Sequence, residues 1–417
     1  MKKLINYDKK LTLYETELDN GLKVYLAPDA RRASFSMNFF VNFGSAIDKY
    51  KQGNKEYDVP QGIAHFIEHQ LFNQPDGTNI SKDIMVLGGS ANASTSTNYT
   101  SYYINGVKNF DKLLKCLIDY VTTPYFEKKS VEIEKGIIIQ ELELYNDDAY
   151  WKGFDGALLN AVHSHPVRND IGGTKESVSN TTVEDLYRVY KAFYKPENMK
   201  IVITGNFDKS KALTIIENYF KKDKFESSEQ VKLIYDKEPR SVLKRNGSKK
   251  MDVATTKGFT LFKIPKQGNV LDLRTSLSVL FSAELLDTSL FQEKYENILY
   301  EFGCFGYEID DYILQMFYYE SDDVKLIKEE IIKRVKNTPD KETFDYIMRA
   351  KEAYRVRFID DVDGLANSIK ISLLLNDEVI DYKKYYEEFT YEKFVETLKM
   401  INFDEYSYFE IRPKDVK

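Results

Sequence analysis

Histidine, cysteine and tryptophan are scarce in this 417-residue chain, which contains four histidines, two cysteines and one tryptophan. Cys116 and Cys304 are too few for a disulfide framework, and their apolar or aromatic surroundings predict buried free thiols. No apolar run approaches the roughly 18 residues of a membrane span. The N-terminus also lacks the apolar stretch of a signal peptide. We therefore expect a cytoplasmic protein without a membrane partner.

An excess of basic residues is also missing. The formal net charge is −7, whereas non-specific binding of nucleic acid usually needs a strongly basic face. Hydrophobic residues make up 42% of the chain and charged residues 30%, which is the composition of a globular protein. This composition argues against nucleic acid as a partner, and the length predicts two domains.

A polar stretch near the middle of the chain indicates where the two domains meet. Residues 221–250 are rich in Lys, Glu, Asp and Ser and have no sustained apolar periodicity, which is typical of a linker with an irregular edge. We predict a first domain at residues 1–222, a linker at 223–250 and a second domain at 251–417. Both halves mix strands with long helices, and a distant duplication of one α+β unit is one interpretation of this pattern.

Hydrophobic periodicity and turn residues predict the elements of each half. The first half is expected to contain a hairpin at 12–28, strands at 34–44, 90–97, 100–107 and 199–207, and helices at 109–121, 127–145 and 181–194, besides a helix that begins near Pro60. The second half is expected to contain strands at 258–265, 312–320 and 405–412, and helices at 271–302, 323–336 and 340–353.

Two of the four histidines stand four residues apart in the segment GIAHFIEHQLF. His65 and His69 share one face of a helix at this spacing, and Glu68 borders the same face. The pattern H-x-x-E-H is the inverted form of the H-E-x-x-H zinc-peptidase motif, and its chance occurrence here is on the order of a few per thousand. An amphipathic helix with two surface histidines is the alternative, but the apolar neighbours predict burial, and buried histidines need a partner. We predict that His65 and His69 bind a metal.

A catalytic zinc ion usually has three protein ligands and one open position. The segment EIEKGIIIQELELYNDD, predicted to be helical, offers Glu132, Glu134, Glu141 and Glu143 as the third ligand. Glu134 and Glu141 lie two helical turns apart and share one face. Glu141 follows three isoleucines, at 137–139, a position that suits a solvated glutamate poorly. The residues alone leave the choice among these glutamates open.

These segments resemble, in order and spacing, the pitrilysin-type (M16) zinc metallopeptidases. GGSANASTSTNYTSYYI, GGTKESV at 172–178 and NMKIVITGNFD at 198–208 are also similar to segments of that family, so the resemblance covers roughly residues 15–210. The compact length resembles the bacterial two-domain subfamily that is related to mitochondrial processing peptidases.

The resemblance assigns a role to each residue of the motif. It implies that His65, His69 and Glu141 bind one zinc ion per chain and that Glu68 is the general base. Glu134, seven positions before Glu141, is implied to orient the site and so to serve catalysis. The implied activity is a zinc metalloendopeptidase that hydrolyses peptide bonds in unfolded peptides, with processing or maturation of a peptide as a candidate role.

The resemblance also implies a fold and a substrate site. The fold would be α+β, with two related domains, each a mostly antiparallel sheet with helices packed on one face, like half of a clamshell. The strand at Ala91–Thr97 is similar to the edge strand to which substrate backbone adds, so Asn92 and Ala93 would line the groove. Family members commonly hold substrate with an arginine and a tyrosine of the second domain. In LYEFGCFGY, Tyr307 occupies the tyrosine position, but Tyr300 stands where the arginine would be.

The tyrosine at position 300 leaves the substrate clamp incomplete, which affects the expected partners. We expect a dimer with a related, non-identical chain, and a homodimer is the alternative. Two other functions stay open: a catalytically weak or silent subunit that acts mainly as a dimer partner, and a metal-dependent hydrolase of substrates other than peptides. His163 and His165, in AVHSHPV, are interpreted as loop or packing residues.

Overall fold

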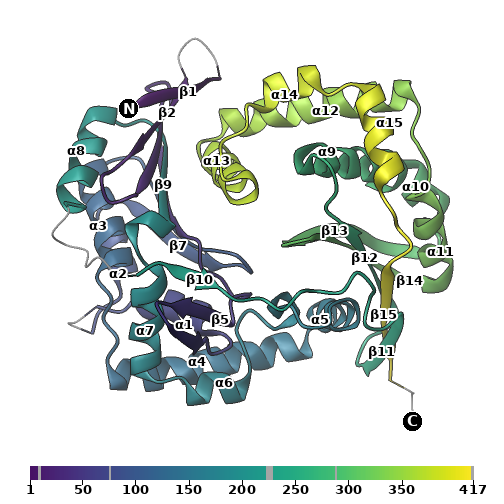
Figure 1. Cartoon of the computed structure of the whole chain (residues 1–417), viewed down its shortest axis with the longest axis horizontal. Helices are drawn as coiled ribbons and strands as arrows, with labels where there is room; N and C mark the ends of the chain where they lie inside the picture. Colours follow the sequence, from purple (N-terminus) through teal and green to yellow (C-terminus); the bar gives the residue numbers. More distant parts are fainter. Residues whose placement is uncertain (8–10, 75–76, 222–228, 287–288, 415–417) are drawn as a thin grey trace. The chain divides into compact units, whose positions relative to one another are not determined.

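A computed structural model of the chain describes residues 1–417 apart from 8–10, 75–76, 222–228, 287–288 and 415–417. Contacts divide the chain into two compact units, neither of which is one stretch of sequence (Figure 1). The first unit comprises Met1–Leu142, Asn169–Tyr235 and Arg355–Asp381, and the second comprises Glu143–Arg168, Asp236–Tyr354 and Tyr382–Lys417. Residues 143–168 and 355–381 thus group by their contacts with the other half of the sequence. The contiguous domain ranges 1–222 and 251–417 stay a prediction.

The first unit is built on a seven-stranded sheet. The strands, in sheet order, are β1 (Lys2–Asn6), β2 (Thr12–Glu17), β3 (Lys23–Pro28), β9 (Met199–Gly205), β4 (Phe35–Val41), β8 (Thr100–Gly106) and β7 (Gly89–Thr95). All neighbouring strands are antiparallel except β3 and β9. A smaller sheet contains β10 (Val231–Leu233), β5 (Lys49–Gln52) and β6 (Lys55–Asp58). Among the strands that the structure describes, β7 ends the large sheet, so the edge strand expected from the sequence is confirmed as an edge.

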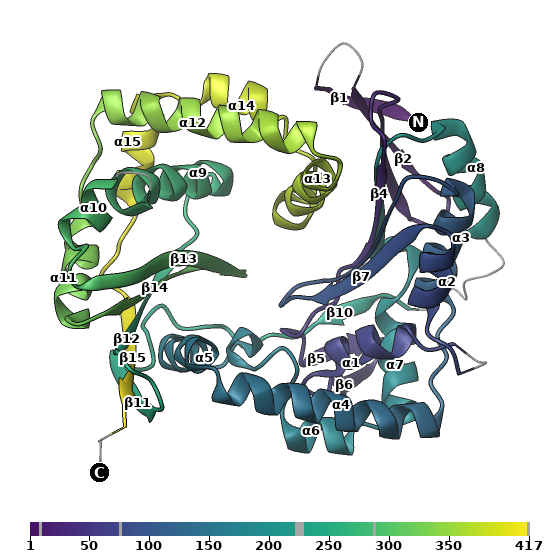
Figure 2. The same cartoon turned by 180° about the vertical axis from the view of Figure 1, so that it is seen from behind.

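Most helices of the first unit cover one face of the large sheet, and α13 lies against the opposite face (Figures 1 and 2). These helices are α1 (Ile63–Leu71), α2 (Ile80–Val86), α3 (Phe110–Thr122), α6 (Lys175–Asn180), α7 (Val183–Phe193), α8 (Lys209–Tyr219) and α13 (Val362–Asn376), with a short 3-10 turn at Pro196–Asn198. The main core includes the buried side chains of Phe39, Ile67 and Leu117. On the other face, Leu365 and Ile369 of α13 belong to a second buried cluster.

The second unit is built on a five-stranded sheet. Its strands, in sheet order, are β11 (Asn246–Met251), β15 (Tyr406–Pro413), β12 (Lys257–Pro265), β14 (Tyr312–Ser321) and β13 (Leu299–Ile309), and only β11 and β15 are parallel. Its helices are α5 (Ala149–Ala161), α9 (Val270–Phe281), α10 (Ser289–Lys294), α11 (Val324–Arg334), α14 (Tyr382–Glu388) and α15 (Tyr391–Met400), with a 3-10 turn at Pro166–Arg168. Leu277 of α9 and Phe262 of β12 share one core. Gly153 of α5 packs closely on Phe259 at the opposite face, where a Cβ atom would lie 2.0 Å from the ring.

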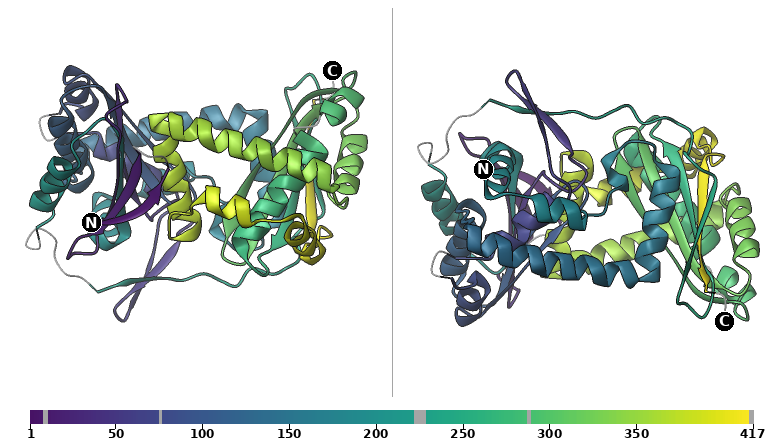
Figure 3. Two further views of the ribbon diagram at one scale, coloured as in Figure 1. Left: turned by 90° about the horizontal axis from the view of Figure 1, so that it is seen from above. Right: turned by 90° about the horizontal axis from the view of Figure 1, so that it is seen from below.

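The borders between the two units fall within two helices of 20 residues, α4 (Lys128–Asp147) and α12 (Lys341–Asp360) (Figure 3). Each has residues in both units. After α4, the chain forms α5, which packs on the second sheet, and after α12 it forms α13, which packs on the first. Each half of the sequence therefore supplies one helix to the sheet of the other half. The expected fold of two related, mostly antiparallel sheets with packed helices is confirmed.

The helix expected at 271–302 is wrong at its C-terminal end. Helix α9 ends at Phe281, a π-helical turn follows at Ser282–Leu286, and the chain becomes strand β13 from Leu299. Phe302 pairs there with Tyr319 of β14, the strand that follows β13 after only two residues, so the two strands form a hairpin where a helix was expected. None of the described helices is long and apolar enough to cross a membrane.

Several helices, among them α5, α8, α13, α14 and α15, were not among the elements expected from the sequence. The region expected to be a linker contains strands β10 and β11, and α12 extends beyond 353 to Asp360. Cys116 and Cys304 are free thiols, as expected, but both are only partly buried.

Candidate metal centre

Helix α1 packs with one face and presents polar side chains on another. Ile63, Phe66 and Ile67 are almost completely buried in the main core. His65 and His69, four residues apart, lie side by side on the polar face, with ring centroids 4.4 Å apart. Their side chains are 15% and 23% exposed, so they are less buried than the apolar sequence predicts but still accessible to only a small extent.

Close backbone packing fixes the start of α1. Gly62 caps the helix with a φ of 82°, and a Cβ atom at this position would lie 2.2 Å from the carbonyl oxygen of Gly172. Gly173 also has a φ of 82°, and a Cβ there would lie 2.6 Å from the carbonyl oxygen of Gln61. Only glycine fits both the left-handed conformation and this approach. The segment GGTKESV thus supports the helix that carries the two histidines.

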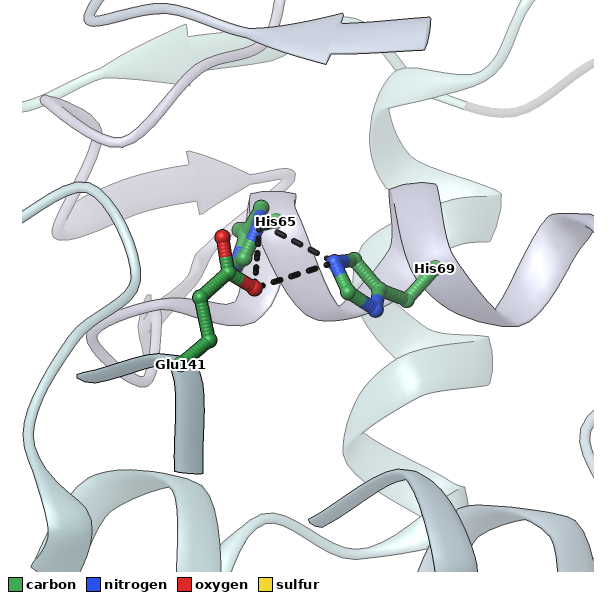
Figure 4. A group of neighbouring side chains, drawn as sticks. All are labelled: His65, His69 and Glu141. Atoms are coloured by element: carbon green, nitrogen blue, oxygen red, sulfur yellow. Dashed lines mark hydrogen bonds and ion pairs between the residues drawn. The ribbon is translucent and has the colours of Figure 1, made fainter. Parts of the chain in front are cut away.

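Three ligand atoms from two helices converge beside α1 (Figure 4). The Nε2 atoms of His65 and His69 are 3.1 Å apart. Oε2 of Glu141, from α4, lies 3.8 Å from Nε2 of His65 and 3.6 Å from Nε2 of His69. The structure therefore brings together His65, His69 and Glu141, and it does so with the nitrogen atoms and the carboxylate facing one another.

The arrangement fits a zinc ion. Ligand atoms bound at about 2.0–2.2 Å to a tetrahedral ion lie about 3.3–3.6 Å from one another, which is close to the separations of 3.1, 3.6 and 3.8 Å between these atoms. Two imidazoles and one carboxylate are also a donor set typical of catalytic zinc. The charged partners of Glu141 among the described residues are the two histidines themselves, at 3.8 and 3.6 Å.

Glu134 contacts His69 on the ring nitrogen that faces away from the other two converging residues. Its Oε1 atom lies 2.8 Å from Nδ1 of His69. A carboxylate at Nδ1 keeps the proton on that nitrogen and leaves the lone pair of Nε2 for a metal. Glu134 and Glu141 therefore act on one group of side chains from the same face of α4, as their spacing predicts. Neither Glu132 nor Glu143 belongs to the converging group.

Glu68 lies on α1 without joining the three converging ligands. It is 8% exposed, and its Oε2 accepts a hydrogen bond of 2.5 Å from Oγ1 of Thr95 on the edge strand. Burial raises the pKa of the Glu68 carboxyl, although the bond to Thr95 and the nearby His69 oppose the rise. A buried carboxylate with a raised pKa beside a metal centre is suited to accept and return a proton.

The two histidines differ in their tendency to become protonated. Burial, with a smaller contribution from His69, lowers the pKa of His65 to about 3, so His65 is neutral at physiological pH and able to bind a metal. Burial also acts to lower the pKa of His69. The hydrogen bond and charge of Glu134, together with Glu68 and Glu141, outweigh this effect and raise that pKa overall.

The residues expected to hold substrate fall in different places. Asn92 is exposed on the edge strand β7, and its Oδ1 accepts a hydrogen bond of 2.8 Å from the backbone N–H of Ala93. Ala93 packs against the main core. Tyr307 belongs to the second unit, on β13. Tyr300 is also on β13, where it is 57% exposed and its hydroxyl lies 2.6 Å from Oδ2 of Asp322.

His163 and His165 pack in the second unit and take no part in the metal centre. Both backbone N–H groups donate to the carboxylate of Glu238, at 2.8 and 3.1 Å. Lys263, which is completely buried, donates to the same carboxylate at 2.6 Å. These contacts attach the segment around Glu238 to the second sheet, so the interpretation of both histidines as loop or packing residues agrees with their contacts.

Sequence reasoning missed Thr95 and the glycines of the 172–173 turn as parts of this centre. Thr95 stands within the quoted strand segment, but an ordinary strand threonine carries no signal of a partner on a distant helix. The Gly-Gly pair at 172–173 predicts a turn. The sequence does not indicate that this turn packs against the start of α1, because that contact depends on the fold.

Comparisons with known proteins agree with the geometry. Residues 24–177 match the family model described as Insulinase (Peptidase family M16), and residues 180–351 match the model described as Peptidase M16 inactive domain. Over 256 residues the chain is 37% identical to the uncharacterized zinc protease YmfH of Bacillus subtilis, a segment that covers 61% of this chain and 60% of YmfH. Cytochrome b-c1 complex subunit 1 of Bos taurus is 24% identical over 210 residues, covering 49% of this chain and 42% of the subunit.

A solved structure shares the fold over nearly the whole chain. The crystal structure of an M16-like peptidase from Alicyclobacillus acidocaldarius superposes with a TM-score of 0.91 and 24% identity, and covers 98% of this chain and 100% of that chain. Identity at this level establishes the fold alone. The chain spans less than two thirds of the length of both curated relatives named above, 60% of one and 42% of the other.

Proposed function

Because the chain belongs to peptidase family M16, we propose that it is a zinc-dependent endopeptidase that hydrolyses peptide bonds in unfolded peptides. The observation that carries the proposal is the convergence of His65, His69 and Glu141, with Glu68 next to His69 on the same helix. In this proposal the three converging residues are the ligands of one zinc ion. The name of the relative YmfH, a zinc protease, supports the choice of metal.

The residues divide the chemistry among them. When bound at this site, zinc supplies Lewis acidity to a peptide carbonyl and lowers the pKa of a water molecule to about 7. Glu68 accepts a proton from the attacking water as the new C–O bond forms. The same carboxyl returns that proton to the amide nitrogen as the C–N bond breaks, which yields a carboxylic acid and an amine. Glu134 keeps the ring of His69 in the required tautomer and orientation.

Substrate binding is part of the same proposal. The free edge of β7 is suited to pair with an extended peptide, with Asn92 and Ala93 lining the groove. Tyr307 is proposed to contact substrate as well. Extended, unfolded chains are the substrates that can add as a strand, so processing or maturation of a peptide is one candidate role and general peptide turnover is the other.

A second candidate function is a catalytically weak or silent subunit. The observation that favours it is Tyr300, which takes the place of the expected arginine and whose hydroxyl is bound to Asp322. The names of the bovine relative, a subunit of a complex, and of the second family model, an inactive domain, are in line with it. A metal-dependent hydrolase of substrates other than peptides is a third candidate, and the free edge strand speaks against it.

One experiment separates these functions. The purified chain is analysed for zinc and assayed with a panel of fluorogenic peptides, before and after removal of metal with a chelator and after return of zinc. We expect one zinc ion per chain and peptide cleavage that is lost on chelation and restored by zinc. Zinc without cleavage, alone or with a paralogue, would favour the silent subunit. Cleavage of esters or phosphates but not peptides would favour the third candidate.

A further inference from the structure

The hydrogen bond between Thr95 and Glu68 joins two parts of the centre that belong to different elements. Thr95 is the last residue of β7, and Glu68 lies in α1. Their oxygen atoms are 2.5 Å apart, a length typical of a hydroxyl that donates to a charged carboxylate. Such bonds are stronger than those between neutral groups. The carboxylate of Glu68 is thus held by the hydroxyl of Thr95.

The direction of the Thr95 side chain follows from the pleat of the strand. Successive side chains of a strand point to opposite faces. Ala91, Ala93 and Thr95 lie on the face toward the main core, where the alanines pack and the threonine reaches Glu68. Asn92 and Ser94 alternate with them and are exposed. The strand that offers its free edge to a peptide therefore also offers a hydroxyl to Glu68.

We propose that Thr95 is the positioning residue of the general base and that it ties the orientation of Glu68 to the strand that receives substrate; this inference rests on the proposed function. A free glutamate side chain samples several rotamers, and holding one of them costs conformational entropy. The hydroxyl of Thr95 offsets this cost before substrate arrives. A peptide that pairs with β7 is then placed in a fixed relation to the base, because one strand positions both.

The test uses three variants of β7. Thr95→Val removes the hydroxyl and keeps the β-branched shape, which suits a strand. Thr95→Ser keeps the hydroxyl. Ser94→Ala is the matched control, since this neighbouring residue is exposed on the other face of the strand. Each variant, and the unaltered chain, is measured for kcat and KM on a fluorogenic peptide, for zinc content and for thermal unfolding.

We expect Thr95→Val to lower kcat by about 10–100-fold, the loss typical when a group that orients a residue of a metal site by a hydrogen bond is removed. KM, zinc content and thermal unfolding should stay close to those of the unaltered chain. Thr95→Ser should recover kcat to within a few-fold, and Ser94→Ala should be unchanged. Affinity for a phosphinic peptide, which mimics the tetrahedral species, should fall in parallel with kcat/KM, while a reduced-amide peptide should bind equally to all variants.

The failure of this inference can be told apart from the failure of the proposed function. If the unaltered, zinc-loaded chain cleaves no peptide, either alone or with a related partner chain, the proposed function is overturned and the inference with it. If the unaltered chain cleaves peptides and Thr95→Val does so equally well, only the inference is overturned. A loss of zinc or of folding in Thr95→Val would also overturn the inference, since the hydroxyl would then serve the fold and not the base. No recovery of kcat in Thr95→Ser would overturn it as well, because the hydroxyl would then not be the group that matters.

Discussion

His69 donates its Nδ1 proton to Glu134 across 2.8 Å, and this bond determines which nitrogen of the ring faces the other ligands. Nε2 is turned toward His65 and Glu141, at 3.1 and 3.6 Å. A carboxylate behind a histidine raises the basicity of the ligand and fixes the plane of its ring. Glu134 is therefore part of the centre without being one of the converging ligands.

Replacement of Glu134 should reduce activity more than metal content. We expect Glu134→Ala to lower kcat/KM by about 10–100-fold, with a smaller loss of bound zinc when the metal is in excess. Glu132→Ala is the matched control, because Glu132 is exposed on the same helix and paired with Lys135. The measurements are zinc content and peptidase rate on the same samples. Complete loss of zinc in Glu134→Ala would make Glu134 a ligand.

Replacement of Glu68 should separate catalysis from metal binding. We expect Glu68→Gln to keep its zinc and to lose about 10²–10⁴-fold in kcat, because an amide cannot accept the proton of the attacking water. Elemental analysis and the fluorogenic-peptide assay give the two quantities. Loss of zinc in this variant, to the extent seen when a ligand is removed, would contradict the role of Glu68 as base.

The choice of Glu141 as third ligand is testable against its neighbour on α4. We expect Glu141→Ala to weaken zinc binding by more than tenfold, measured by competition with a chelator, because one of three protein ligands is removed. Glu143→Ala should leave the affinity unchanged, since Glu143 is exposed and outside the converging group. His65→Ala and His69→Ala should behave like Glu141→Ala. The reverse result for the two glutamates would move the ligand to position 143.

Acid should weaken the second unit through Glu238. Burial raises the pKa of this carboxyl, but the backbone N–H groups of His163–His165 and the ammonium of Lys263 outweigh it and lower the pKa from 4.5 to about 2. A carboxyl whose pKa is lowered in the folded state adds stability above its unfolded pKa, and this stability is lost as the pH falls through the folded value. The contribution is about 3 kcal/mol, present in full above pH 5 and lost between about pH 4.5 and 2.

We therefore expect Glu238→Gln to lower the thermal unfolding temperature clearly at pH 7, where it also leaves the buried Lys263 without its counter-ion. The difference from the unaltered chain should shrink steadily as the pH is lowered from 4.5 toward 2.5. Glu329→Gln, an exposed glutamate on α11, is the control and should show no difference at either pH. A gap that stays constant over this range would rule out titration of Glu238 as its source.

Assembly should decide the level of activity. We expect the chain to act as a dimer, and with a related non-identical chain in preference to itself, because Tyr300 replaces the expected arginine. The chain is purified alone and with candidate paralogues, and mass in solution and peptidase rate are measured for each. Full activity from a strict monomer would contradict dimerisation, and full activity from a homodimer would contradict the preference for an unlike partner.

Two local signals of the candidate metal centre could be read from the sequence. The spacing of His65 and His69 predicts a shared helix face, and the seven-residue spacing of Glu134 and Glu141 predicts a second one. That the two faces meet was not contained in either spacing, and it came from resemblance to a family. The partner of Glu68 could not be foreseen at all, since Thr95 reaches it only through the position of β7 beside α1.

The errors in the fold have two sources. The stretch at 299–302 contains Tyr300 and Phe302, which suit a strand, and pairing with the next strand, β14, makes it one. No helix was predicted at Val362–Asn376, where α13 buries Leu365, Ile369 and Leu373. Nothing local in those residues tells which sheet they cover, and the structure places them on the first.

The reciprocal placement of α5 and α13 limits how this chain can be divided. A gene shortened after residue 222 would encode every strand of the first large sheet but not α13, and would leave Tyr25 and Phe40, which are buried beneath it, open to water. Such a fragment should aggregate when expressed alone. A full-length chain that is nicked by a protease at 223–250 keeps both helices in place. Its two pieces should then co-elute in size-exclusion chromatography until a denaturant separates them. The cut breaks the backbone, but α5 still packs on the second sheet and α13 on the first.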